Sequence, residues 1–118
     1  MLVSYPALFY LETSEGYDSG FSVFFPDFSE MAGTSGSDIS EAIENASDYL
    51  GILLADEIEE ERTLPAPSFI SSLSLIENNP FKNDAEFTLE YDAEKSFISM
   101  VSVDLSEYLG SEEPVKKH

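Results

Sequence analysis

The pattern of apolar and polar residues predicts a β-hairpin at the start of the chain. Residues 2–11 form an apolar run rich in β-branched and aromatic side chains, and residues 21–25 form a shorter run of the same kind. Such runs are typical of β-strands. Residues 13–20 between them are dense in Gly, Ser, Thr and acidic residues, which favour a turn. Pro6 lies inside the first run and indicates either an edge position or a local bulge.

The middle of the chain predicts an amphipathic helix, which is the clearest element of the sequence. Asp38 is placed to cap the first turn, and Glu41 follows three residues later, as in a capping box. Pro65 and Pro67 forbid continuation, and we expect the helix to end near Glu60. The apolar positions recur at spacings of three and four residues, which places them on one stripe that covers a sheet: Ile39, Ala42, Ile43, Ala46, Tyr49, Leu50, Leu53 and Leu54.

The second half of the chain predicts another hairpin. Residues 87–91 alternate between apolar and polar side chains, and after a turn at residues 92–95 a longer apolar run covers residues 96–105. Residues 69–75 are interleaved with serine and are compatible with a strand or a short helix. A short third strand is expected around residues 31–34.

Together these elements predict an α+β fold, in which an antiparallel sheet is covered by one principal helix. The 118 residues suffice for one domain, which we place at residues 1–110, with a brief helical turn at residues 104–110. With 42% hydrophobic residues, nine Phe and six Tyr, the chain can bury a substantial core. Residues 111–118 have the composition of a linker.

Charge restricts the class of partner. The chain has 24 acidic residues against five Lys and Arg, a formal net charge of −19. Nucleic acid is therefore not expected as a direct ligand, because phosphate binding needs clustered basic side chains. The charge favours a basic protein partner, which opposite potentials would steer toward this chain. Solubility alone is the alternative explanation.

Catalytic and cofactor motifs are not evident. The chain has no Cys, and its one His is the terminal His118, so a nucleophile activated by His has no base. No glycine-rich loop carries the lysine of a phosphate-binding loop. We expect no cofactor and no metal site. No apolar run approaches the roughly 18 residues of a membrane span, and no leader precedes the first strand, so a cytoplasmic protein without membrane contact is expected.

Four segments, in this order, resemble the N-terminal domain of HicB-type antitoxins of type II HicA/HicB toxin–antitoxin systems. They cover roughly the first half of the chain. They are the opening strand around Tyr5 and Pro6, the strand that ends at Pro26 and Asp27, the helix start at residues 36–46, and the proline pair Pro65 and Pro67.

The resemblance implies a partial ribonuclease-H-like fold and the neutralisation of a HicA-like toxin, a small basic ribonuclease. Carboxylates would occupy the surface on which the toxin holds RNA phosphates, and aromatic side chains would anchor the interface. Core packing is an equal alternative for Tyr17, Phe25 and Phe28. For each single acid, a solvated charge without any contact is favoured over a contact with the toxin. The candidate toxin-binding residues are Glu12, Glu15, Tyr17, Asp18, Phe25, Asp27, Phe28 and Glu30.

The resemblance leaves two further expectations. One is the alternative function of a metal-dependent ribonuclease, which would need several carboxylates around two metal ions about 3.5 to 4 Å apart. The other is transcriptional, because HicB-type antitoxins commonly continue into a ribbon-helix-helix or helix-turn-helix domain that binds their own promoter. Residues 111–118 would be the linker to such a domain or its start, and we expect operator binding and a homo-oligomer in the intact protein through it.

Overall fold

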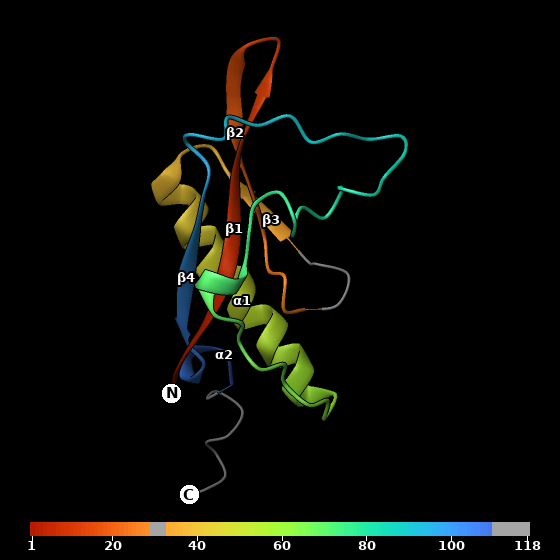
Figure 1. The fold of residues 1–118 in the computed structure, drawn as a ribbon. Coiled ribbons are helices and arrows are strands. Elements are labelled where there is room, and N and C mark those ends of the chain that lie inside the picture. The colour runs from red at the N-terminus through yellow and green to blue at the C-terminus, as the bar shows by residue number, and fades with distance from the viewer. Residues whose placement is uncertain (29–32, 110–118) are drawn as a thin grey trace, which may run out of the picture.

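A computed structural model describes residues 1–28 and 33–109 of the chain. It contains a four-stranded antiparallel sheet with the strand order β3-β2-β1-β4. One long helix, α1 (Ile39–Glu59), lies across one face of this sheet (Figure 1). The predicted α+β class is therefore confirmed. The strands are β1 (Leu2–Ser14), β2 (Tyr17–Phe24), β3 (Gly33–Gly36) and β4 (Phe97–Asp104).

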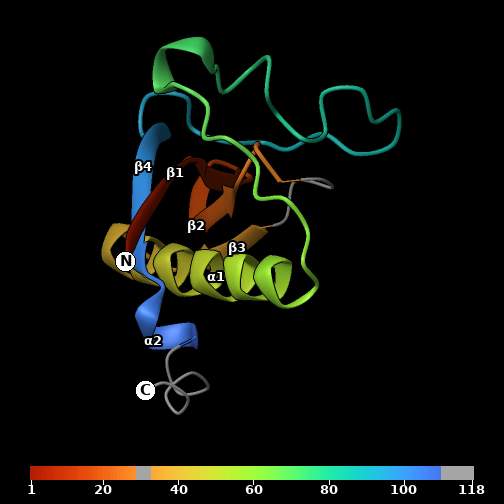
Figure 2. The ribbon, with the colours of Figure 1, turned by 90° about the horizontal axis from the view of Figure 1, so that it is seen from below.

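The first strand is buried on both of its faces. Tyr5, Ala7, Phe9 and Leu11 point toward α1 and belong to the larger core cluster. Leu8, Tyr10 and other even-numbered positions point the opposite way, because successive side chains of a strand alternate. That second face is covered by a long connection, which lies across the sheet from α1 (Figure 2).

The connection between α1 and β4 forms a layer with little regular structure. Its one short helix is the 3-10 turn η2 (Ile70–Ser72), in the stretch expected to form a strand or short helix. Tyr10 donates its hydroxyl to the Leu75 carbonyl at 2.6 Å, and burial raises the pKa of Tyr10, which keeps this donor protonated. The apolar side chains that cover Leu8 and Tyr10 come from across the connection: Leu75, Phe81, Leu89 and Tyr91.

The helix forms where the sequence predicts it. Asp38 accepts a hydrogen bond from the Glu41 backbone amide at 2.8 Å, and Glu41 accepts in turn from the Ser37 amide and hydroxyl, both at 2.6 Å. These bonds satisfy amide groups that have no partner within the first turn. The helix ends at Glu59, with Glu60 as its C-cap, so the predicted end near Glu60 is confirmed.

The buried stripe of α1 is narrower than predicted. Ala42, Ala46, Leu50, Gly51 and Leu54 are buried, whereas Ile39 and Ile43 remain 50% and 43% exposed. The helix begins so close to the sheet that a Cβ at Gly36 of β3 would overlap the Ala42 backbone. Small residues therefore face the sheet in this first part of the helix. The larger side chains of Ile39 and Ile43 lie at the edge of the contact between helix and sheet.

The predicted second hairpin is wrong. Residues 87–91 form no strand with β4 and make a single β-bridge, between Tyr91 and Glu12. β4 pairs instead with β1, from Leu2↔Asp104 to Phe9↔Phe97. The alternation of residues 87–91 has another cause, since Leu89 and Tyr91 point inward to cover the face of β1.

Smaller predictions have mixed outcomes. β3 spans Gly33–Gly36, partly beyond the expected residues 31–34, of which 31 and 32 lie outside the described residues. The expected helical turn near the end of the domain is α2 (Ser106–Leu109). Pro6 lies opposite Met100 of β4, while pairing with β2 starts only at Leu8, so β1 is locally an edge at Pro6 although it is central beyond it.

Replacement of Leu50 by Ala tests the packing of α1. Leu50 is fully buried against the sheet, so the change should lower the free energy of unfolding by about 2 to 5 kcal/mol. Leu53, which is only partly buried, should lose less. Chemical denaturation measures both values. The exposed Glu44→Ala variant is the control and should stay within about 0.5 kcal/mol; an equal loss there would show that the buried face is misassigned.

Candidate functional site

The β1–β2 hairpin projects past the ends of β3 and β4 (Figure 1). Its turn consists of Glu15 and Gly16, both with positive φ, 54° and 86°. Two such residues make the tight turn whose twist matches that of paired strands. The next residue, Tyr17, is 77% exposed, although aromatic side chains usually gain stability by burial. The hairpin tip is therefore a protruding acidic and aromatic surface.

Four of the predicted toxin-binding residues lie together at this hairpin. Glu15, Tyr17 and Asp18 are exposed at or next to the turn, and Glu12 lies on the adjacent part of β1. Asp18 forms an exposed ion pair with Lys95, with 3.7 Å between the carboxylate oxygen and Nζ. An exposed pair of this kind contributes little to stability, so Asp18 can exchange partners.

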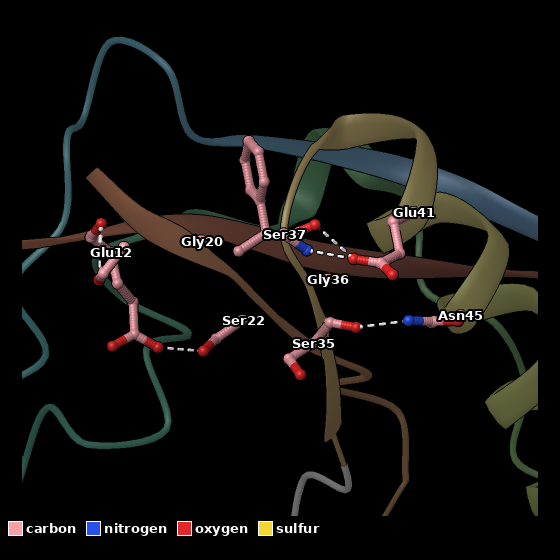
Figure 3. Close-up of a pocket in the computed structure, with 10 residues that line it drawn as sticks. Glu12, Gly20, Ser22, Ser35, Gly36, Ser37, Glu41 and Asn45 are labelled. Atoms are coloured by element: carbon pink, nitrogen blue, oxygen red, sulfur yellow. Dashed lines mark hydrogen bonds between the residues drawn. The ribbon is translucent and has the colours of Figure 1, made fainter.

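A polar groove of about 470 Å³ begins beside the hairpin and runs across β2 and β3 to the start of α1 (Figure 3). Glu12 accepts a hydrogen bond from the Ser22 hydroxyl on one side of it. On the other side Asn45 donates to the Ser35 carbonyl at 2.9 Å, and Glu41 accepts from Ser37. The hydrogen bonds from Ser37 hold the pKa of the Glu41 carboxyl below its usual range, so Glu41 carries its charge there.

A second hollow adjoins this groove at Ser19, Gly20, Phe21 and Ser37. It has a volume of about 580 Å³ and is bordered by the half-exposed Ile39 and by three charged side chains: Asp18, Asp38 and Lys95. Gly20 has a φ of 107°, and a Cβ there would lie 3.3 Å from the Gly36 carbonyl oxygen. Any other residue would be strained at this φ, so the position between the two hollows favours glycine.

Among the side chains of the groove, only Glu12 is predicted from the sequence to belong to a site. The sequence pattern does not identify Ser22, Ser35 and Asn45, and it identifies Glu41 only as a helix cap. A usable signal was present, because serine recurs on both β2 and β3 in a chain whose buried strand positions are apolar. The groove forms only when β3 pairs with β2, a contact that periodicity alone does not predict.

Three of the other four predicted site residues have structural roles. The rings of Phe25 and Phe28 are buried in the core, at 0% and 6% exposure, so core packing is the correct alternative for both. Asp27 accepts hydrogen bonds from the Ser68 amide at 2.9 Å and from its hydroxyl at 2.5 Å. Glu30 lies outside the described residues.

Asp27 and Tyr5 form a clamp on the connection after α1. Tyr5 donates its hydroxyl to the Pro65 carbonyl at 2.6 Å, three residues before the Ser68 that Asp27 holds. Burial, and then the nearby Asp27 carboxylate, raise the pKa of Tyr5, so the hydroxyl remains a donor. The clamp ties the end of β2 and the start of β1 to the stretch containing the proline pair.

Residues 1–28 and 33–109 contain neither a metal-binding cluster nor a membrane-spanning helix. Within these ranges, no three or more His, Asp or Glu side chains are grouped so that they could hold a metal ion. Nor does any helix in this part of the chain combine the length and apolarity needed to cross a membrane.

Comparison with known proteins gave a family and two structures. Residues 4–76 match the family model for the HicB-like antitoxin of bacterial toxin–antitoxin systems. A chain of a toxin–antitoxin complex from Streptococcus pneumoniae is 58% identical, with a TM-score of 0.87 over 100% of this chain and 80% of that chain. A chain of the HicA3 and HicB3 toxin–antitoxin complex is 18% identical, with a TM-score of 0.55 over 86% and 99%, which is a likeness of fold. The comparison with curated proteins gave no match.

Replacement of Asp27 by Ala tests whether this residue clamps the connection. Loss of the acceptor leaves the partly buried Ser68 amide without its partner, so the free energy of unfolding should fall by about 1 to 3 kcal/mol. Chemical denaturation measures the change, and the exposed Glu86→Ala variant is the control. A stable Asp27→Ala variant that binds a partner less tightly would instead place Asp27 in an interface.

Proposed function

The chain belongs to the HicB-like antitoxins of bacterial toxin–antitoxin systems, and we propose that it neutralises a HicA-like toxin, a small basic ribonuclease, in the cytoplasm. The toxin would be held by the hairpin tip and the adjoining polar groove. Inhibition would come from covering the basic surface on which the toxin binds RNA, and this chain would act without chemistry of its own.

The observation that carries this proposal is the exposed cluster Glu15, Tyr17 and Asp18 at the hairpin tip. Tyr17 offers a large rigid ring that loses little conformational entropy when an interface orders it, and tyrosine is enriched among the residues that dominate binding energy. The two carboxylates around it can accept charge-assisted hydrogen bonds from Lys or Arg, as RNA phosphates do.

The outer edge of β2 adds a main-chain element to the proposed surface. β3 pairs with β2 only from Phe21 to Phe24, so no described strand lies beside Tyr17 to Gly20 on that edge. Such an edge can pair with a strand of a partner. The groove beyond it ends at two glutamates, Glu12 and Glu41, which suits a basic side chain extending from the same partner.

Electrostatics supports a basic partner for this chain. Within residues 1–28 and 33–109, each of the three basic side chains is already paired with an acid: Arg62 with Asp56 and Glu57, Lys82 with Glu77, and Lys95 with Asp18. The remaining acids leave a strongly negative surface, which would steer a basic protein toward it at a rate that falls with ionic strength.

Hairpin variants test the proposed surface in an RNA-protection assay with the cognate toxin. The wild-type chain should protect RNA at equimolar toxin. Tyr17→Ala should weaken binding by about 2 kcal/mol, roughly 30-fold, because it removes the central anchor. Asp18→Lys should slow association, because it replaces an attraction by a repulsion. Full protection of RNA by both variants would exclude the hairpin from the interface.

Matched controls separate this surface from general effects. Ile76→Ala removes another well-exposed apolar side chain, and Glu59→Lys reverses a charge at the far end of α1. Both should leave binding close to that of the wild type. Added salt should slow association of the wild type more than that of Asp18→Lys, because the variant has less attraction to be screened.

We further propose that autorepression, where the intact protein performs it, does not use the described residues. Sequence-independent affinity for DNA comes from Lys and Arg that neutralise phosphates, and Arg62, Lys82 and Lys95 are occupied by neighbouring acids. Operator binding would then need a separate basic element, such as the ribbon-helix-helix or helix-turn-helix domain of related antitoxins.

A gel shift on DNA from upstream of the operon tests this division. Residues 1–109 should not shift the DNA at moderate salt, because they lack a free basic surface. The full product of the gene, assayed beside them, is the comparison. Sequence-specific binding by residues 1–109 alone would contradict the charge argument.

A further inference from the structure

Among the basic side chains within residues 1–28 and 33–109, only that of Lys95 pairs with an acid of the hairpin. Its Nζ lies 3.7 Å from a carboxylate oxygen of Asp18, one of the acids expected to bind the toxin. Lys82 pairs instead with Glu77 in the connection, and Arg62 pairs with acids at the end of α1. The chain therefore places a cation of its own on a carboxylate that a basic partner would use.

The second hollow, which Lys95 borders, combines apolar and acidic walls. Its lining residues Leu11 and Phe21 are buried, at 7% and 6% exposure, and form its floor. Asp18 and Asp38 place carboxyl groups at its border. Lysine and arginine suit such a hollow, because each carries a charged head on a long aliphatic stem. Lys95 thus shows which kind of side chain this hollow accepts.

The turn before β4 holds the backbone of Lys95 in place without its side chain. The Lys95 amide donates to Asp92, at 3.2 Å to the carboxylate and 3.3 Å to the backbone carbonyl. The hydroxyl of the buried Ser96 donates to the same carbonyl at 2.7 Å and accepts from the Leu11 amide at 2.9 Å. Replacement of the Lys95 side chain should therefore remove its charge and leave the turn intact.

The ion pair between Asp18 and Lys95 is weak enough to be exchanged. The two side chains are 51% and 61% exposed, so water competes for both charges. Their separation of 3.7 Å also exceeds the length of a charge-assisted hydrogen bond, roughly 2.7 to 2.9 Å. A guanidinium or ammonium group of a partner can approach Asp18 more closely, and an interface that excludes water strengthens the new contact.

We propose that Lys95 competes with the toxin within this chain: it pairs with Asp18 in the free protein and is displaced when a basic side chain of the toxin enters the hollow. This role of Lys95 rests on the proposed function, because it concerns the same acidic surface. Displacement breaks the pair and brings two cations close together, so Lys95 lowers affinity for any basic protein. Only a partner with further contacts at the hairpin and groove then binds tightly, which favours the toxin over other basic proteins.

Replacement of Lys95 by Met tests the competition with the full chain and the purified cognate toxin. Methionine keeps an unbranched apolar stem and removes the charge. Affinity for the toxin, measured by isothermal titration calorimetry, should rise about three- to tenfold, because no pair is broken and no cation is repelled on binding. Loss of a polar contact from the free chain is thus expected to strengthen binding.

Lys82→Met is the matched control for this variant. Lys82 is also exposed and paired with an acid, at 3.5 Å from Glu77, and the hollow that it borders is lined by residues 77–84 alone. Both variants make the chain more negative by one charge, so the general attraction of a basic toxin rises equally. The gain of Lys95→Met beyond this control should shrink in an Asp18→Asn background, because the contested carboxylate is gone.

Stability separates competition from a structural role of the pair. Chemical denaturation should give Lys95→Met and Lys82→Met similar free energies of unfolding. If the pair instead holds the hairpin in position, Lys95→Met should be less stable than the control and should bind the toxin more weakly. An affinity of Lys95→Met at or below that of Lys82→Met overturns the role of Lys95 and leaves the proposed function standing. A wild-type chain that does not bind the toxin overturns both.

Discussion

The burial of β1 on both faces is the constraint on which the rest of the structure depends. A strand without a solvent face needs a cover on each side, and α1 provides only one. The other cover is a connection that lacks a ladder of its own, so side chains fix it in place. Tyr10 and Tyr5 donate hydroxyl hydrogen bonds to its carbonyls, and Asp27 holds Ser68. Apolar contact alone would leave the partly buried carbonyls of Pro65 and Leu75 without these partners, and an unpaired carbonyl shielded from water is unfavourable.

The same constraint determines where recognition can take place. Between Tyr5 and Leu11 every side chain of β1 is committed to the core, so this strand presents side chains only before Tyr5 and beyond the bulge that follows Leu11. There it continues into the hairpin, outside the reach of β4 and β3. The residues of the hairpin contribute little to the core and are free to serve an interface. A rigid strand pair anchored in a two-sided core is also a firm support for the exposed Tyr17, which favours affinity by limiting the entropy lost on binding.

The elements that the sequence predicted correctly are those fixed by local interactions. The start of α1 follows from Asp38 and Glu41, whose hydrogen bonds span three residues, and the first hairpin from a turn of adjacent residues. The elements it missed depend on distant contacts. Alternation in residues 87–91 is the same for a paired strand as for a coil whose Leu89 and Tyr91 face the core. Four of the eight candidate site residues lie together at the hairpin, three of them exposed. The burial of Phe25 and Phe28 after β2 depends on tertiary packing that no local pattern encodes.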